Sequence, residues 1–221
     1  MTALDDIQRP EPRWPAVIAA CSAVALQFSL PAPLRMGPPG ALAAVVGVLV
    51  VGANLTRRRG QHRANSVLSY VALGVLTAAL VYGVGALLFA VLRNAEKAPQ
   101  LLASGSVLWA INVIVFASWY WRLDAGGPNA RERRDAHTEG AFLFPQMTVS
   151  SPTARDKTIA EEQNWRPHFV DYLFVAFNTS TAFSPTDAPV LSRWAKAAMM
   201  VQAIISFTTV VLIAARAVNI L

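Results

Sequence analysis

The chain has 221 residues, of which 54% are hydrophobic and 14% are charged. Soluble domains carry about 25% charged residues, so this composition excludes an ordinary soluble globular protein. The net charge of +6 would favour nucleic acid as a partner of a soluble chain. Here the arginines lie between long apolar segments, where membrane orientation explains them, and we expect no nucleic acid to bind.

Five segments without Asp, Glu, Lys or Arg predict five transmembrane helices in an all-α integral membrane protein. Each approaches the roughly 17 to 25 apolar residues that cross a bilayer core. These segments are residues 14–34, 36–56, 64–92, 98–121 and 197–215. The lipid bilayer is therefore the first expected partner.

The predicted elements divide the chain into two parts. We expect residues 1–100 to form an N-terminal three-helix membrane module, with helices at about 14–30, 41–55 and 66–92. Glycines Gly74, Gly83 and Gly85 in its third helix predict close packing of a neighbouring helix. Cys21, the single cysteine, excludes an intramolecular disulfide, and its place in an apolar helix predicts that it is buried.

The second part, residues 101–221, contains elements of a different kind. We expect an outer helix at about 104–121, a long polar loop at 123–165, a re-entrant helix with a following extended segment at 167–189, and a final helix at about 193–219. Residues 141–145 are the apolar cluster of the polar loop. They either pack locally or lie against the membrane surface or a neighbouring subunit.

A short apolar run at residues 169–177 predicts the re-entrant helix, because nine residues are too few to span a bilayer. Pro167 and Asp171 favour a helix that begins here, and Pro185 prevents its continuation. Hydroxyl side chains follow this helix. Polar extended backbone at membrane depth requires burial in protein or a wet cavity, so the pattern is typical of a pore loop.

These residues resemble the tetrameric pore-loop channels of the potassium-channel superfamily. The run Thr-Ser-Thr-Ala-Phe-Ser-Pro-Thr-Asp at 179–187 aligns without a gap to the Thr-Ala-Thr-Thr-Val-Gly-Tyr-Gly-Asp filter signature, and 200–207 resembles the inner helix of that fold. The resemblance implies a homotetramer that passes monovalent cations. The sequence contains no cofactor motif, so we expect no cofactor and no metal beyond the permeating cations. It assigns the pore and filter to Thr179, Ser180, Thr181, Ala182, Phe183, Ser184, Pro185, Thr186 and Asp187, and the inner helix to Gln202, Ala203, Ser206 and Phe207.

The filter departs from the potassium-channel pattern at its most restrictive positions. Ser184 and Thr186 replace the two glycines, Pro185 replaces the tyrosine, and Ala203 stands at the gating-hinge glycine. A strict potassium filter needs glycine backbone angles, so we expect instead a constriction lined by hydroxyls and the Asp187 carboxylate. Asn178 and Gln202 are better explained by hydrogen bonds between helices than by pore lining.

A second resemblance is to uncharacterised bacterial integral membrane proteins with Phe-Pro-Gln and Phe-Ser-Pro-Thr-Asp motifs, here at 144–146 and 183–187. It implies a bacterial inner membrane location. Lys and Arg are concentrated in the N-terminal arm, in 56–65 and in 122–196, and with five spans these segments share one side. The positive-inside rule then predicts that the N-terminus and the pore loop are cytoplasmic.

Two other functions are alternatives to a channel. The first is a non-conducting scaffold or assembly protein, in which the re-entrant helix serves packing and the 123–165 loop recruits partners. The second is a membrane enzyme, for which the sequence has neither a His-Glu-x-x-His nor a Gly-x-Ser-x-Gly motif. His62, His137 and His168 are spread over separate loops, so we expect no enzyme.

Overall fold

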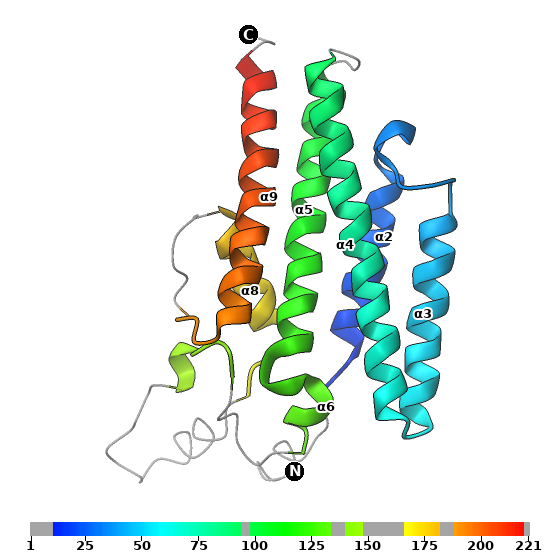
Figure 1. The fold of residues 1–221 in the computed structure, drawn as a ribbon, viewed down its shortest axis with the longest axis vertical. Helices are drawn as coiled ribbons and strands as arrows, with labels where there is room; N and C mark the ends of the chain where they lie inside the picture. Colours follow the sequence, from blue (N-terminus) through cyan, green and yellow to red (C-terminus); the bar gives the residue numbers. More distant parts are fainter. Residues whose placement is uncertain (1–10, 94–97, 134–139, 148–165, 182–187, 219–221) are drawn as a thin grey trace, which may run out of the picture.

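The computed structural model describes residues 11–93, 98–133, 140–147, 166–181 and 188–218. Within these ranges the fold is helical, with one isolated antiparallel bridge between Phe142 and Val190. The described part of the chain contains six longer helices (Figure 1): α2 (Trp14–Phe28), α3 (Ala41–Arg58), α4 (His62–Leu92), α5 (Ala98–Leu123), α8 (Phe169–Thr181) and α9 (Arg193–Val218).

Four of these helices, α3, α4, α5 and α9, are long and apolar enough to cross a membrane. With 31 residues, α4 is about 46 Å long, which exceeds a hydrocarbon core of about 30 Å. The prediction of an all-helical fold is thus confirmed for the described residues, and four of the helices have the length and composition of the predicted spans.

The first predicted span is shorter than expected. Helix α2 has 15 residues and ends at Phe28, below the length of an ordinary span. The chain continues into a short 3-10 helix, Ala32–Leu34, whose Leu34 is buried. Cys21 is exposed on α2, so the prediction that it is buried was wrong.

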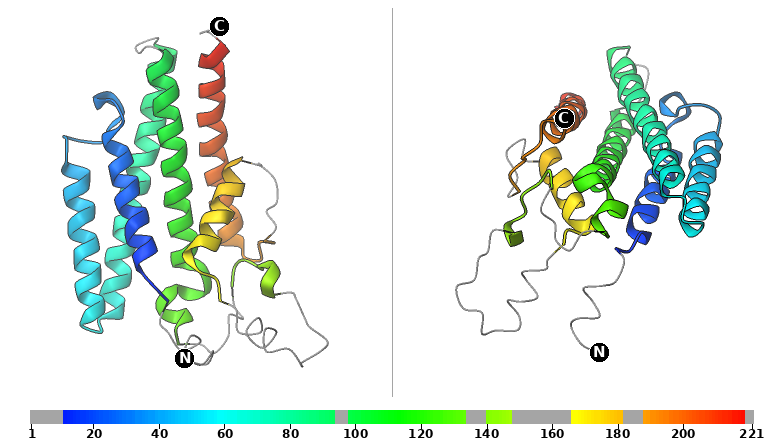
Figure 2. Two further views of the ribbon diagram at one scale, coloured as in Figure 1. Left: turned by 180° about the vertical axis from the view of Figure 1, so that it is seen from behind. Right: turned by 60° about the horizontal axis from the view of Figure 1, so that its bottom comes forward.

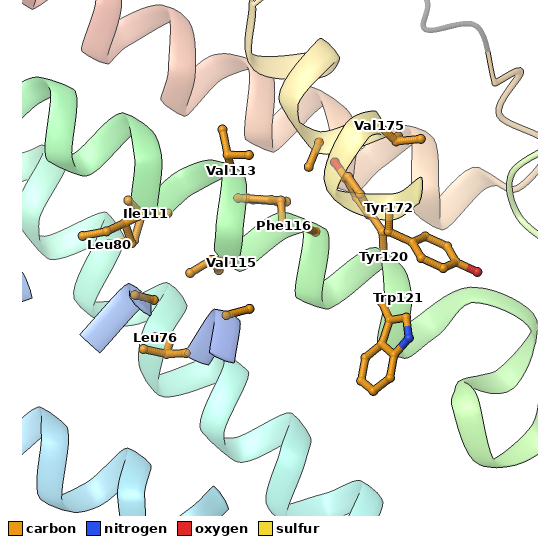
Figure 3. Close-up of a cluster of buried hydrophobic side chains, with 14 of the residues drawn as sticks. Leu76, Leu80, Ile111, Val113, Val115, Phe116, Tyr120, Trp121, Tyr172 and Val175 are labelled. Atoms are coloured by element: carbon orange, nitrogen blue, oxygen red, sulfur yellow. The ribbon is translucent and has the colours of Figure 1, made fainter. Parts of the chain in front are cut away.

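Helix α5 lies at the centre of the bundle. It packs against α2 and α4 on one side and against α8 and α9 on the other. Its buried side chains Ile111, Val113, Val115 and Phe116 form the middle of the hydrophobic core (Figure 3). Both predicted parts of the chain are therefore joined through this helix.

Two glycines permit close helix contacts. A Cβ atom on Gly83 would lie 2.7 Å from Leu108 Cδ2, and one on Gly105 would lie 2.5 Å from Ile213 Cγ1. Gly83 therefore allows α4 to pack closely against α5, and Gly105 allows α5 to pack closely against α9. Gly74 and Gly85 have no atom within 4 Å of such a Cβ, so of the three predicted contact glycines only Gly83 has this role among the described residues.

We call the end of the bundle where α5 ends the basal end (Figures 1 and 2). Here the Arg122 side chain donates a 3.0 Å hydrogen bond to the Asn65 carbonyl near the start of α4. The Arg13 side chain, which precedes α2, donates a 3.1 Å hydrogen bond to Asn129. The basal end therefore contains the start of α2, the start of α4 and the end of α5. This arrangement follows because successive helices run in opposite directions.

Candidate functional site

Helix α8 begins at the basal end, with its first turn capped by its own residues. The Asp171 carboxylate accepts a 2.7 Å hydrogen bond from the backbone N–H of His168. A carboxylate in the first turn also interacts favourably with the helix dipole. The predicted start at Pro167 and the observed start at Phe169 thus differ by two residues, and Asp171 has the predicted position.

A buried carboxylate fixes the start of α8 to the end of α5. The Tyr172 hydroxyl donates a 2.6 Å hydrogen bond to Asp124 Oδ2, and the backbone N–H of Ala141 donates to Oδ1 of the same carboxylate at 2.5 Å. Both Asp124 and Tyr172 have no exposed surface. Figure 3 shows Tyr172 beside Tyr120 and Trp121 of α5. One carboxylate therefore joins α5, α8 and the segment at residue 141.

The apolar cluster at 141–145 packs within the chain. Phe142 is 1% exposed, and its ring lies 5.3 Å from the ring of Tyr120 and 6.2 Å from that of Trp194, between centroids. The backbone N–H of Leu143 donates to the Pro189 carbonyl at 2.9 Å, and that of Leu191 donates to the Ala141 carbonyl at 2.8 Å. Local packing, one of the two predicted alternatives, is therefore what the structure shows.

These contacts place the chain on both sides of α8 at the same end of the bundle. Residues 189–191 pair with 141–143, which in turn contact Tyr172 in the first turns of α8. The next helix, α9, starts at Arg193. The chain therefore leaves the basal end as α8 and is again at this end when α9 starts, as Figure 2 shows.

A buried polar network holds the other end of α8. The Gln202 side-chain amide of α9 donates to the Ala176 carbonyl at 2.7 Å and to Ser180 Oγ at 2.8 Å. The Ser206 hydroxyl donates to the Ser180 carbonyl at 2.7 Å. Gln202 and Ser206 have no exposed surface, and Ser180 is 1% exposed. The last turn of α8 is thus bonded to the middle of α9.

Helix α5 completes this network. The Tyr120 hydroxyl donates to Gln202 Oε1 at 2.5 Å, and the Asn112 amide donates to the Gln202 carbonyl at 3.3 Å. The Trp109 indole N–H donates to the Ser180 carbonyl at 3.4 Å. Three helices therefore share one set of hydrogen bonds, and the explanation of Gln202 by bonding between helices is confirmed.

The depth of the network along the bundle follows from helix geometry. Gln202 is nine residues after Arg193, which corresponds to about 14 Å along α9 at 1.5 Å per residue. The 13 residues of α8 span about 20 Å. Because Ser180 contacts Gln202 and Ser206, α8 ends about halfway along its partner helix.

The two sides of α9 differ in environment. Gln202, Ser206 and Thr209 form a buried polar stripe that faces α5 and α8. The opposite stripe is exposed and apolar, and its members are Met200, Ile204, Phe207 and Val211. Ala203 lies between the stripes and is half-buried. Of the predicted inner-helix residues, Gln202 and Ser206 therefore face the inside of this chain and Phe207 faces outward.

The predicted filter residues fall into two groups. Thr179 is buried and its hydroxyl donates to the Val175 carbonyl at 2.8 Å, while Thr181 is exposed and its hydroxyl donates to the Phe177 carbonyl at 3.0 Å. Ser180 belongs to the network described above. The remaining predicted positions lie outside the described residues: Ala182, Phe183, Ser184, Pro185, Thr186 and Asp187.

Sequence reasoning missed three residues that organise this unit: Asn112, Tyr120 and Asp124. Asn112 is a polar residue in an uncharged predicted span, and such residues commonly bond between helices, so a signal was present. Tyr120 lies near the end of the predicted outer helix, and Asp124 lies in the predicted polar loop. Nothing in the local sequence indicates that Asp124 is fully buried.

No group of three or more His, Cys, Asp or Glu side chains in the described part of the chain is placed to hold a metal ion. Comparison of the chain with protein-family models, with curated proteins and with solved structures found no match. Inference about function therefore depends on the geometry of α5, α8 and α9.

Proposed function

We propose that this chain is the subunit of a homotetrameric pore-loop channel that passes monovalent cations. Helix α5 would be the outer helix, α8 the re-entrant pore helix, residues 179–187 the constriction and α9 the inner helix. Hydroxyls and the Asp187 carboxylate would line the constriction. The lack of filter glycines makes a strict potassium filter a poor fit.

The observation that carries this proposal is the position of α8 between two long helices. It starts at the basal end and stops beside Gln202, about 14 Å along α9, which is close to half of a hydrocarbon core of about 30 Å. The chain then returns to pair with residues 141–143 at the basal end. A short helix that ends at mid-depth can direct the negative end of its dipole toward a cation.

The exposed apolar stripe of α9 supports an assembly of several subunits. Met200, Ile204 and Val211 are exposed on the side of α9 opposite Gln202. In the proposed tetramer this stripe faces the inner helices of neighbouring subunits and the pore axis. Helices α2 to α4 would then form the periphery.

One observation favours the alternative, a non-conducting scaffold or assembly protein. Ser180 at the end of α8 has both its carbonyl and its hydroxyl bonded within the chain, to Ser206 and Gln202. Such bonding fits a helix that serves only packing, because the polar groups at its end have hydrogen-bond partners without an ion. In this alternative the long 123–165 segment recruits partners.

Ion flux and oligomeric state together separate the two functions. Purified protein in liposomes is expected to pass K⁺ or Na⁺ as a tetramer, and Asp187→Asn is expected to lower the flux severalfold because it removes the ring of carboxylates at the mouth. Asp6→Asn in the N-terminal arm is the matched control. A monomer in images of single particles would contradict the channel, and a tetramer without flux would favour the scaffold.

We infer that the protein lies in a bacterial inner membrane with five spans, the fifth being α2 together with the residues that follow it, and with the basal end in the cytoplasm. The basic residues at the junction of α3 and α4 support this orientation. A C-terminal reporter enzyme that works only in the cytoplasm is expected to be inactive. Activity of this fusion would reverse the orientation.

A further inference from the structure

A cavity of about 100 Å³ lies among α2, α3, α4 and α5, close to the basal end. Its walls are mostly apolar, and include Ala16, Ala20, Val50, Leu73 and Leu76. Asn54 is exposed on α3 and also lines it, so the cavity reaches the surface of the bundle.

Three guanidinium groups line the basal part of this cavity, those of Arg13, Arg57 and Arg122. The Arg13 side chain is 9% exposed, and its Nε and Nη1 atoms are buried without a hydrogen-bond partner. Its Nη2 atom is bonded to Asn129. The guanidinium carbon lies 5.6 Å from the centroid of the Trp121 ring, which holds the group in place. Two donor nitrogens of a nearly buried cation are thus available to an acceptor in the cavity.

Arg122 is a second buried cation. It is 6% exposed, and its side chain donates to the backbone carbonyl and to Oδ1 of Asn65 at 3.0 and 3.1 Å. Among the described residues, no carboxylate lies within ion-pair distance of it. A buried guanidinium without a counter-charge is costly, so an anion bound here would stabilise the fold.

The carboxylates nearby do not balance the arginines of the cavity. Glu132 lies 2.8 Å from Arg13 and 3.9 Å from Arg57, as measured between Oε1 and the Nη2 atoms. Glu11 is paired instead with Arg131, at 2.9 Å. Burial lowers the pKa of the Arg13 guanidinium, and Glu132 and Glu11 partly oppose this effect. One carboxylate against three guanidiniums leaves an excess of positive charge.

We propose that this cavity binds the phosphate group of an anionic phospholipid at Arg13, Arg57 and Arg122, with the acyl chains along the apolar surface of α2 and α3. The guanidinium geometry suits a phosphate, because its N–H groups form paired hydrogen bonds with phosphate oxygens. The apolar walls select a lipid over a free phosphate ion. Basic pockets between transmembrane helices are a recognised type of anionic-lipid site. This inference does not depend on ion conduction.

Native mass spectrometry of the delipidated full chain in neutral detergent tests the proposal. Phosphatidylglycerol is expected to bind at least about tenfold more tightly than phosphatidylcholine with the same acyl chains. Equal affinities for the two lipids would overturn the proposal. Inorganic phosphate is the third probe, and binding as tight as that of phosphatidylglycerol would overturn the assignment to a lipid.

Two substitutions with opposite expected effects on the affinity for phosphatidylglycerol test the position of the site. Arg13→Gln is expected to weaken phosphatidylglycerol binding by about tenfold, because charge-assisted hydrogen bonds are lost. Glu132→Gln is expected to tighten it severalfold, because it removes the competing carboxylate. Arg59→Gln, an exposed arginine at the same end, is the control and is expected to leave the affinity unchanged.

A further variant tests the acyl-chain surface without a change of charge. Ala20→Leu, on the α2 wall of the cavity, is expected to weaken phosphatidylglycerol binding severalfold. This variant also keeps the test decisive if Arg13→Gln does not fold. Unchanged affinity in both Glu132→Gln and Ala20→Leu would place the lipid elsewhere and overturn the proposal.

Discussion

The side-chain amide of Gln202 donates a 2.8 Å hydrogen bond to the hydroxyl of Ser180, and this contact fixes the last turn of α8 to the middle of α9. Both residues are buried, so neither exchanges this bond for one with solvent. The contact sets how far α8 extends along the bundle.

Gln202→Leu is expected to lower the free energy of unfolding by about 1 to 3 kcal/mol, because the Tyr120 hydroxyl and the Ala176 carbonyl lose their partner. Chemical denaturation of the detergent-solubilised protein would measure the change. Met200→Leu, on the exposed side of the same helix, is the control and is expected to have little effect. Equal stability of both variants would show that the network contributes nothing.

Gly105→Ala is expected to destabilise the contact between α5 and α9 by about 1 to 3 kcal/mol, the usual cost of overpacking. The new Cβ would lie 2.5 Å from Ile213 Cγ1 and 2.9 Å from its Cδ1. Ile213→Ala removes these atoms, so the same glycine substitution is expected to cost less in that background. A double-mutant cycle on thermal unfolding measures this coupling.

Gly74→Ala is the matched control for Gly105→Ala. Gly74 is also a helical glycine, but a Cβ there meets no atom within 4 Å. Alanine has the higher helix propensity, by about 1 kcal/mol, so this variant is expected to be neutral or more stable. Destabilisation equal to that of Gly105→Ala would mean that close packing is not the cause.

Gly127→Ala is expected to disrupt the turn after α5 and to cost about 1 to 3 kcal/mol. Gly127 has φ 86° and ψ 172°, a conformation that L-residues avoid, and its Cβ would lie 2.6 Å from the Arg122 carbonyl oxygen. Gly60→Ala offers a comparison, since φ is 72° but no atom lies within 4 Å. In thermal unfolding, the melting temperature of Gly127→Ala is expected to lie well below that of Gly60→Ala. The reverse order of melting temperatures would contradict this account.

Tyr172→Phe is expected to loosen the joint between α5, α8 and the segment at residue 141. The substitution removes the hydroxyl that donates to the fully buried Asp124 carboxylate at 2.6 Å. We expect a loss of about 1 to 3 kcal/mol and faster hydrogen exchange of the backbone N–H groups of 141–143. Tyr82→Phe, at an exposed tyrosine on α4, should change neither quantity.

The amino-acid sequence by itself determined which segments are long and apolar, because the number of uncharged residues sets the length of a span. It also determined that residues 169–177 are too few to cross a bilayer, and α8 is indeed a helix of 13 residues. The polar character of Gln202 in an apolar helix correctly indicated a bond to another helix. These inferences succeed because each depends on local composition.

The tertiary structure alone decided what the polar residues contact. Asp124 lies in a segment whose composition predicts a polar loop. It is nevertheless fully buried, because Tyr172 and Ala141, which are distant in sequence, donate hydrogen bonds to its carboxylate. Likewise, Arg13, Arg57 and Arg122 come from separate segments and line one cavity because α2, α3 and α5 meet at the basal end. Helix α2, predicted to end at about residue 30, ends at Phe28, and the chain then forms a 3-10 helix whose Leu34 is buried, a contact that local composition does not indicate.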